Sequence, residues 1–158
     1  MQNNKKNSGM TKFESAVRNT PDIAAGYKKG IQAFGANSSC VQVDDTRKLE
    51  GSVDIDKCTR DIYPDKSRWD YALGYDEKAY FIEVHPASIS DVATMIAKSK
   101  WLKEWLKEKA KDLEVLKAND NYYWLATGKI KILPKSRQYR MLMENKILLR
   151  SKFKLPLE

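Results

Sequence analysis

Two acidic residues, Asp70 and Glu83, have a spacing that could place them side by side. They belong to two apolar runs within residues 69–85, which are joined by Asp76 and Glu77. If the runs form a hairpin closed by these two residues, Asp70 lies directly opposite Glu83 and both carboxylates share one face of the sheet. Cross-strand neighbours have Cβ atoms roughly 4.5–5.5 Å apart, so two negative charges there are destabilising unless a cation neutralises them. The pair is therefore a candidate metal site.

His85 is the only histidine of the chain and follows Glu83 by two residues. Side chains two residues apart on a strand lie on one face, so the imidazole is expected beside the two acids. There it could act as a general base or as a further metal ligand. Two plainer alternatives are that His85 caps the end of its strand by hydrogen bonding and that the acids are solvated on an edge hairpin. Apolar residues on both faces of the hairpin favour a buried pair, in which unpaired carboxylates are costly.

The 158-residue chain has a formal net charge of +8, and most of it comes from the C-terminal part. Residues 128–158 hold nine Lys or Arg against two Glu. This basic segment, expected as an extension from about residue 129, suits contact with the phosphates of DNA or RNA, although a charged soluble surface is a common alternative. The candidate nucleic-acid-binding residues are Lys98, Lys100, Lys131, Lys135, Arg137 and Arg140.

The rest of the composition narrows the class of protein. Cys40 and Cys58 are far apart and lack the spacing of a zinc site or of a disulfide framework. No apolar run approaches the roughly 20 residues needed to cross a bilayer, so we expect no membrane contact and a cytoplasmic location. Residues 1–10 are polar and predict a disordered lead, and residues 11–158 are long enough to form a single α/β domain.

The elements that would position the acids follow from apolar spacing and from helix-capping residues. The hairpin is preceded by a loop over 59–67 and ends at Pro86. Ser88 and Asp91 resemble a capping box that begins a long helix. In chain order, the sequence predicts a helix over 20–35, strands at 40–43 or 52–55, the hairpin, a helix from about 88 to 117, a strand over 122–127 and a short helix around 136–145.

Two tryptophans, Trp101 and Trp105, lie one turn apart on the long helix, beside its leucine stripe. We expect them to widen the apolar face that packs into the core. A platform on which nucleic-acid bases stack is the first alternative. An interface between two copies of the chain, giving a homodimer, is the second.

The acidic hairpin, with a helix after it and a further strand after that helix, resembles the PD-(D/E)xK nuclease superfamily. The resemblance covers roughly residues 20–128. Asp70 matches the first acid of the family motif, Glu83 matches the second, and His85 stands where the family has lysine. The resemblance implies a restriction-endonuclease-like α/β fold, in which a central mixed sheet carries the acidic hairpin and is flanked by helices.

The resemblance also implies a chemistry. Asp70 and Glu83, with the Val84 carbonyl, would hold Mg²⁺ or Mn²⁺, which are hard cations that prefer oxygen ligands. The ion would lower the pKa of a bound water and stabilise charge on the phosphate that this water attacks in DNA or RNA. Further acids that could approach the ion are Glu14, Asp22, Asp54 and Asp56.

Histidine in the place of lysine leaves three interpretations. His85 serves as base or third ligand in a variant that cleaves, or Lys98 or Lys100 on the following helix supplies the missing ammonium, or the site is inactive and only binds. We predict a metal-dependent nuclease with Asp70, Glu83 and His85 as catalytic residues. The alternative is a non-catalytic module that binds nucleic acid or a protein.

Overall fold

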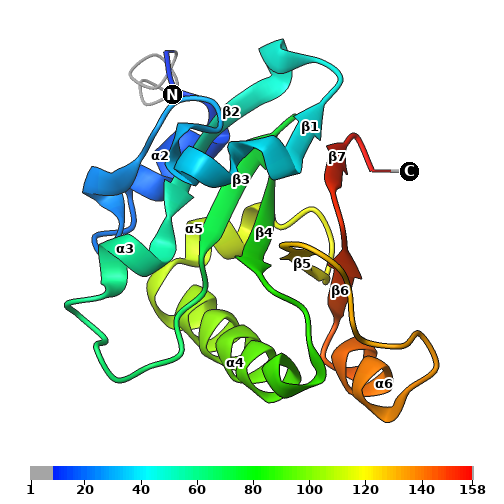
Figure 1. The fold of residues 1–158 in the computed structure, drawn as a ribbon. Helices are drawn as coiled ribbons and strands as arrows, with labels where there is room; N and C mark the ends of the chain where they lie inside the picture. Colours follow the sequence, from blue (N-terminus) through cyan, green and yellow to red (C-terminus); the bar gives the residue numbers. More distant parts are fainter. Residues whose placement is uncertain (1–8, 158) are drawn as a thin grey trace.

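A five-stranded mixed sheet forms the centre of the computed structural model, which describes residues 9–157 (Figure 1). The strand order is β2-β3-β4-β5-β6. The first three strands are antiparallel neighbours, whereas β5 runs parallel to β4 and β6 runs parallel to β5. The strands are β2 (Leu49–Asp54), β3 (Tyr71–Tyr75), β4 (Lys78–His85), β5 (Tyr122–Ala126) and β6 (Ile147–Arg150). The predicted α/β class, with a mixed sheet flanked by helices, is confirmed.

The hairpin between β3 and β4 has the predicted register. Tyr75 pairs with Lys78, and the two residues between them, Asp76 and Glu77, have φ values of 50° and 66°. Positive φ at both central residues is the signature of a two-residue type I′ turn, whose twist matches that of the strands. The pairing continues back along β3 to its first residue, so Asp70, one residue earlier, falls opposite Glu83.

Helices cover one face of the sheet. They are α2 (Lys12–Arg18), α4 (Val92–Lys109), α5 (Lys111–Leu116) and α6 (Arg137–Glu144). Side chains from α2, α4 and α5 form one buried cluster with β2, β3 and β4, and those from α4 and α6 form a second with β5 and β6. Trp105 lies in the first cluster and is 3% exposed, which confirms its predicted place in the core.

The opposite face is covered by the 3₁₀ segment Gln32–Cys40 and by a small parallel sheet of β1 (Val41–Val43) and β7 (Phe153–Leu155). Phe34 and Phe153 pack there against side chains of β3, β4 and β5. The basic segment after residue 129 therefore supplies a helix, two strands and core side chains to the fold. The charged side chains of this segment therefore belong to elements that pack into the core of the fold.

The long helix begins as predicted. Ser88 and Asp91 form a capping box, which satisfies backbone donors at the start of the helix. The helix is interrupted at Ala110, whose backbone leaves the helical region (φ −135°, ψ 50°) between α4 and α5. Leu113 beyond the break still packs into the same cluster as Leu106, so the apolar spacing continues and hides the break in the sequence.

The helix predicted over 20–35 is wrong. The helix at this end of the chain is α2, which Thr11 caps, and the following segment consists of turns and short 3₁₀ pieces such as Ala24–Gly26. Ile23 packs on the helix-covered face of the sheet and Phe34 on the opposite face. Their helical spacing therefore does not reflect one apolar face, and the segment wraps around the edge of the sheet instead.

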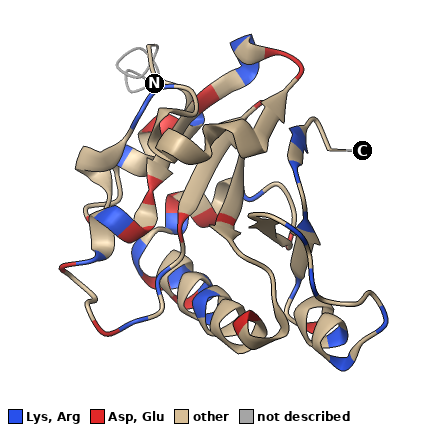
Figure 2. Cartoon of the chain, viewed as in Figure 1, with Lys and Arg blue, Asp and Glu red and all other residues tan. Residues whose placement is uncertain are grey.

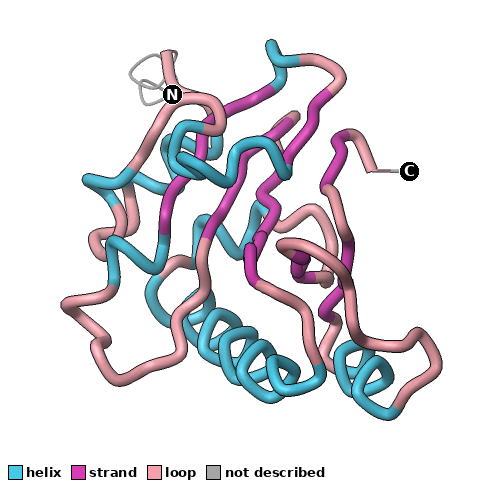
Figure 3. The backbone as a smooth tube through the Cα atoms, in the orientation of Figure 1, coloured by secondary structure: helices cyan, strands magenta, loops and turns pink. Residues whose placement is uncertain are grey.

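Loops flank α4 on two sides. Figure 3 shows the loop after the short helix α3 (Ile55–Thr59) on one side and the loop that leads into α6 on the other. In the part of the chain that the structure describes, no helix is long and apolar enough to cross a membrane. The predicted disordered lead, residues 1–10, lies outside the described residues except for Gly9 and Met10.

Candidate functional site

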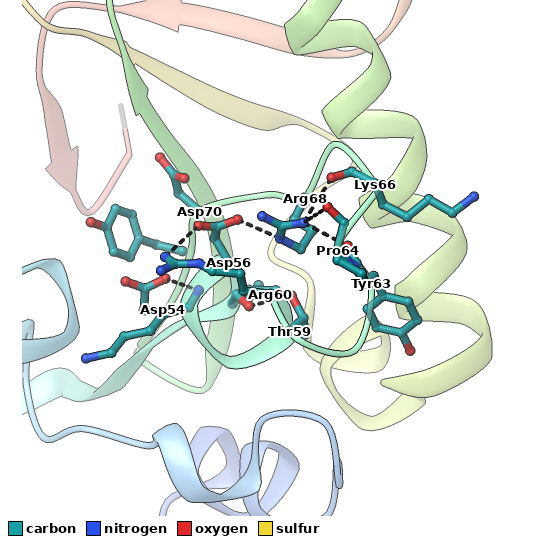
Figure 4. A network of polar contacts seen from close by, with 12 residues as sticks. Asp54, Asp56, Thr59, Arg60, Tyr63, Pro64, Lys66, Arg68 and Asp70 are labelled. Atoms are coloured by element: carbon teal, nitrogen blue, oxygen red, sulfur yellow. Dashed lines mark hydrogen bonds and ion pairs between the residues drawn. The ribbon is translucent and has the colours of Figure 1, made fainter.

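Three carboxylates lie where β2 ends, where β3 begins and where β4 ends. Because β3 is antiparallel to both neighbours, these points meet at one edge of the sheet. Asp54 is the last residue of β2 and caps α3 through the amide of Lys57. Asp70 immediately precedes β3, and Glu83 lies near the end of β4. Figure 4 labels Asp54 and Asp70 at this edge, with Asp56 and Arg68 close by.

Asp70 and Glu83 are locked together by reciprocal hydrogen bonds. The Asp70 amide donates to Glu83 Oε1 at 3.0 Å, and the Val84 amide donates to Asp70 Oδ2 at 3.1 Å. Glu83 is fully buried and Asp70 is half-buried. The cross-strand pair predicted from the sequence therefore exists, and each carboxylate is held by a backbone donor of the other strand.

Lys98 of α4 supplies a positive charge to this pair. Its Nζ lies 2.5 Å from Glu83 Oε2, and only 18% of its side chain is exposed. Lys100, two residues further along the helix, is exposed to solvent. Of the two lysines considered as a source of the missing ammonium, the structure brings Lys98 to the acids. The sequence alone was a weak basis for choosing Lys98, because α4 carries five lysines.

The carboxylates resist losing their protons. Burial raises the pKa of Glu83 well above its ordinary value, and the charge of Asp70 adds to this effect, while Lys98 opposes it. Burial likewise raises the pKa of Asp70 against the opposing charge of Lys98. The pKa of Asp54 is raised by burial and by the charges of Asp70 and Asp56. Burial is the largest cause of the raised pKa at each of these three carboxyls, so the metal-free edge favours their neutral forms, whereas a bound cation would favour the ionised forms.

Lys98 keeps its proton at neutral pH. Burial lowers its pKa, but the charges of Glu83 and Asp70 and the hydrogen bond to Glu83 outweigh burial, so the net shift is upward. The side chain thus offers a fixed ammonium beside two carboxylates. An ammonium in that position can donate to an anionic group, such as a phosphate oxygen, that approaches the acids.

Asp56 organises the neighbouring loop. Its carboxylate accepts from Arg68 Nε at 2.8 Å and from Arg60 Nη2 at 3.3 Å. Arg68 also donates through Nη1 to the carbonyls of Tyr63, at 2.7 Å, and Lys66, at 3.2 Å (Figure 4). We therefore interpret Asp56 as the anchor of this loop, although it was a candidate for approaching the metal. The sequence did not indicate the role of Arg68.

His85 lies at the same edge but turns to other partners. Its Nδ1 is 2.8 Å from the Pro86 carbonyl and 3.8 Å from a carboxylate oxygen of Asp91. The ring meets Trp124 edge-on, with centroids 6.4 Å apart. Among residues 9–157, no hydrogen bond or ion pair joins His85 to Asp70 or Glu83.

The basic loop between β5 and α6 runs beside the end of β4. The Thr127 amide donates to the His85 carbonyl at 3.2 Å, and the Lys131 amide donates to the Ala87 carbonyl at 2.9 Å. This loop and the first turns of α6 carry exposed positive charges (Figure 2). They include the predicted phosphate-binding residues Lys131, Lys135, Arg137 and Arg140.

Two other candidate acids have structural partners. Glu14 pairs with Arg18 on the surface of α2, at 2.8 Å. Asp22 accepts from the Tyr63 hydroxyl at 2.6 Å and from Trp105 Nε1 at 3.0 Å, so it satisfies two polar groups at the edge of the core. Trp101 stacks on Trp105, with centroids 5.6 Å apart. Neither acid belongs to the cluster at Asp70.

Within the described residues, no group of three or more His, Cys, Asp or Glu side chains forms a ready metal cage. Mg²⁺ usually keeps several waters and is bound by one or two carboxylates together with substrate phosphates. Asp70 and Glu83 supply two carboxylates, the number that this mode of binding uses, but both Glu83 oxygens already accept hydrogen bonds. Comparison with protein-family models, with curated proteins and with solved structures found no match for this chain.

Proposed function

We propose that this chain is a metal-dependent nuclease that hydrolyses phosphodiesters of DNA or RNA at Asp70, Glu83 and Lys98. The observation that carries the proposal is the contact of the Lys98 ammonium with Glu83, whose partner across the hairpin is Asp70. Two carboxylates and an ammonium at one end of neighbouring strands are suited to bind a cation and a phosphate together.

The arrangement of elements supports this proposal. A meander of β2, β3 and β4 is followed by α4 and then by β5, which is parallel to β4. This order agrees with what the resemblance to the PD-(D/E)xK superfamily implies. The family lysine would then be replaced by Lys98, which reaches the second acid from the helix rather than from the strand.

Each residue has a distinct part in the proposed reaction. Asp70 and Glu83 would hold Mg²⁺ or Mn²⁺, which supplies an activated water and neutralises charge on the phosphate. Lys98 would donate a hydrogen bond from Nζ to that water or to a non-bridging phosphate oxygen. Asp54, at the end of β2, would add negative charge beside the metal ligands without contacting the phosphate.

The structure favours Lys98 over His85 as the source of the positive charge. Lys98 contacts Glu83, whereas His85 contacts Pro86 and lies near Asp91. A role for His85 as base or third ligand stays a prediction, and the variant His85→Ala tests it. If Lys98 is the functional group, His85→Ala retains most of the activity.

The proposal is tested by cleavage assays on duplex DNA, single-stranded DNA and RNA with Mn²⁺, Mg²⁺ or EDTA. We expect Asp70→Asn, Glu83→Gln and Lys98→Met each to lower kcat by about 10²–10⁴-fold. Lys107→Met is the matched control, because it removes an exposed lysine from the same helix that is not a candidate nucleic-acid-binding residue. Equal activity in wild type and the Asp70 and Glu83 variants would disprove the proposed site.

A non-catalytic nucleic-acid-binding module is the second candidate. The observation in its favour is the internal pairing of Glu83 with Lys98, which already neutralises one carboxylate. This candidate predicts no cleavage with any metal, together with salt-sensitive binding that is unchanged in Asp70→Asn. Binding that strengthens when Mn²⁺ is added, and only when Asp70 is intact, argues against it.

A further inference from the structure

A cavity of about 530 Å³ opens beside the acidic edge. Its volume lies within the roughly 300–1,000 Å³ that small-molecule pockets occupy. The walls come from the turn segment 21–35, which connects α2 to the first strands, and from the end of β2 with the first turns of α3. Its lining includes Asp54, Lys28, Lys57, Gln32, Cys58 and Ala25.

Asp54 belongs to both the cavity and the acidic edge. It lines the cavity, and it is the last residue of β2, next to the start of β3 that Asp70 precedes. Asp54 also pairs with Tyr71 across β2 and β3. Asp54 is the one residue that the cavity shares with the acidic edge, since Asp70, Glu83 and Lys98 do not line it.

The chemistry of the cavity suits a nucleotide. Apolar side chains, including those of Ile23 and Ala33, line it together with the Gln32 carboxamide, which can both donate and accept hydrogen bonds. Lys28 and Lys57 add two positive charges, and Asp22 and Asp54 add two carboxylates. A planar base needs apolar contact on its faces and polar groups at its edge, and its phosphate needs cations.

The wall of the cavity is held in place by specific contacts. Lys28 exchanges two backbone hydrogen bonds with Ser52 of β2, at 2.9 and 2.8 Å, and the Ala33 amide donates to Ser52 Oγ at 3.0 Å. Gly26 passes so close to Cys58 that a Cβ atom there would lie 2.2 Å from the thiol sulfur. The turn segment is thus fixed to the sheet and to α3, and the cavity is preformed.

We propose that this cavity binds one nucleotide of the substrate strand, with its base in the apolar interior and its phosphate at Lys28 and Lys57. The inference rests on the proposed function, because it is the nuclease site that places a nucleic-acid strand beside Asp54. The cavity then fixes which nucleotide lies next to the phosphate that is cleaved. It makes the segment 21–35 a determinant of specificity.

Binding is tested without cleavage through Cys58, which lines the cavity beside Gly26. Cys40→Ser removes the only other thiol of the chain. In this variant, a nucleoside 5′-monophosphate at about ten times its Kd should slow alkylation of Cys58 by iodoacetamide about tenfold. Inorganic phosphate at the same concentration should protect much less, because it lacks the base. Equal protection by phosphate, or no protection by any of the common monophosphates, overturns the proposal.

A matched pair of substitutions locates the binding. Ala25→Trp places an indole in the lining, and Ala36→Trp places one at an exposed position outside it. Isothermal titration should show loss of nucleotide binding in Ala25→Trp and retention in Ala36→Trp, with thermal melting as the check on folding. If Ala25→Trp does not fold, Gln32→Ala replaces it and should weaken binding. Unchanged affinity in the folded lining variant contradicts the inference.

Cleavage products separate this inference from the proposed function. A set of oligonucleotides carries one abasic residue each, at successive positions. The wild type should cleave less efficiently when the missing base adjoins the scissile phosphate. Cleavage that is indifferent to the abasic position leaves the nuclease intact and removes the nucleotide cavity. If nucleotide protects Cys58 but the protein cleaves no substrate, nucleotide binding in the cavity is supported and the proposed nuclease activity is disproved.

Discussion

Glu83 divides its two carboxylate oxygens between the Asp70 amide and the Lys98 ammonium, and it does so with no exposure to solvent. Such a group is costly when ionised unless its partners are all in place. The backbone donor and the ammonium each lower that cost, and a bound cation would lower it further. The behaviour of this one carboxyl group is therefore a sensitive measure of the whole site.

The raised carboxyl pKa values give the metal-free protein a distinctive dependence on pH. The unfolded chain ionises Glu83 at its ordinary pKa of about 4.3, whereas the folded protein does so at higher pH. The folded state binds more protons in between, so the free energy of unfolding falls as pH rises through that interval. The fall is about 1.4 kcal/mol for each unit of difference in pKa.

Urea denaturation between about pH 4.5 and pH 8 measures this effect. Glu83→Gln, which cannot ionise, should flatten the pH dependence, and excess Mn²⁺ should reduce it in the wild type by favouring the ionised form. Stability that rises with pH over this range in the metal-free wild type would contradict the assigned direction.

At the scale of the elements, the loop after α3 depends on one side chain. Arg68 is 14% exposed and joins Asp56 to the backbone of the loop. Hydrogen bonds to charged groups contribute about 1.5–3 kcal/mol when partly buried. Arg68→Ala should therefore destabilise the protein by about 2 kcal/mol in chemical denaturation. Arg60→Ala, which removes the exposed partner of the same acid, should cost no more than about 1 kcal/mol.

The hairpin turn offers a second prediction at this scale. Glu77 has a φ of 66°, in the left-handed region that disfavours side chains with a Cβ atom. Glu77→Gly should be more stable than Glu77→Ala by about 1 kcal/mol. The alanine variant is the matched control because both substitutions remove the exposed ion pair with Lys12. Equal melting temperatures of the two variants would show that the turn is not strained there.

The sequence predicts elements well where one local pattern determines them. The register of the hairpin follows from the two-residue turn, and the start of α4 follows from the capping box at Ser88. Apolar spacing gives a wrong prediction where neighbouring apolar side chains pack into different clusters. Ile23 and Phe34 have helical spacing but pack on opposite faces of the sheet. The pairing of β1 with β7 joins segments too distant in the chain for a local pattern to reveal.

The candidate site was predictable in the same uneven way. The acids could be placed by counting along two strands, because strand alternation is regular. The contact of Lys98 with Glu83 depends on how α4 docks on the sheet, which no spacing specifies. The orientation of the His85 side chain toward Pro86 and Asp91 depends on the loop that follows β4. The cavity at Asp54 depends on the irregular segment 21–35.

At the scale of the whole molecule, charge is distributed unevenly around the acidic edge. Exposed lysines and arginines follow the loop before α6 and its first turns, and the Lys131 amide ties that loop to the end of β4 (Figure 2). A nucleic acid bound at the acids would meet these charges. They would contribute affinity without sequence specificity, since phosphate contacts carry no base information.

Salt dependence measures that contribution. Each phosphate contact contributes about 0.9 to the slope of log K against log salt concentration for duplex DNA. The double variant Lys135→Ala, Arg137→Ala should lower the slope by about 1.8 if both residues contact phosphates. Lys111→Ala, an exposed lysine on the separate helix α5, is the control and should leave the slope unchanged. Fluorescence anisotropy over a salt series gives both values.

The ammonium of this site comes from a helix, whereas both carboxylates come from the sheet. A small rotation or shift of α4 would withdraw Lys98 from Glu83 without breaking any hydrogen bond between strands. The distance between the opposite charges is therefore controlled by the packing of α4, through side chains such as Leu102 and Leu106 in the core. Under the proposed function, a substitution beneath α4 that shifts the helix would lower activity by separating Lys98 from Glu83.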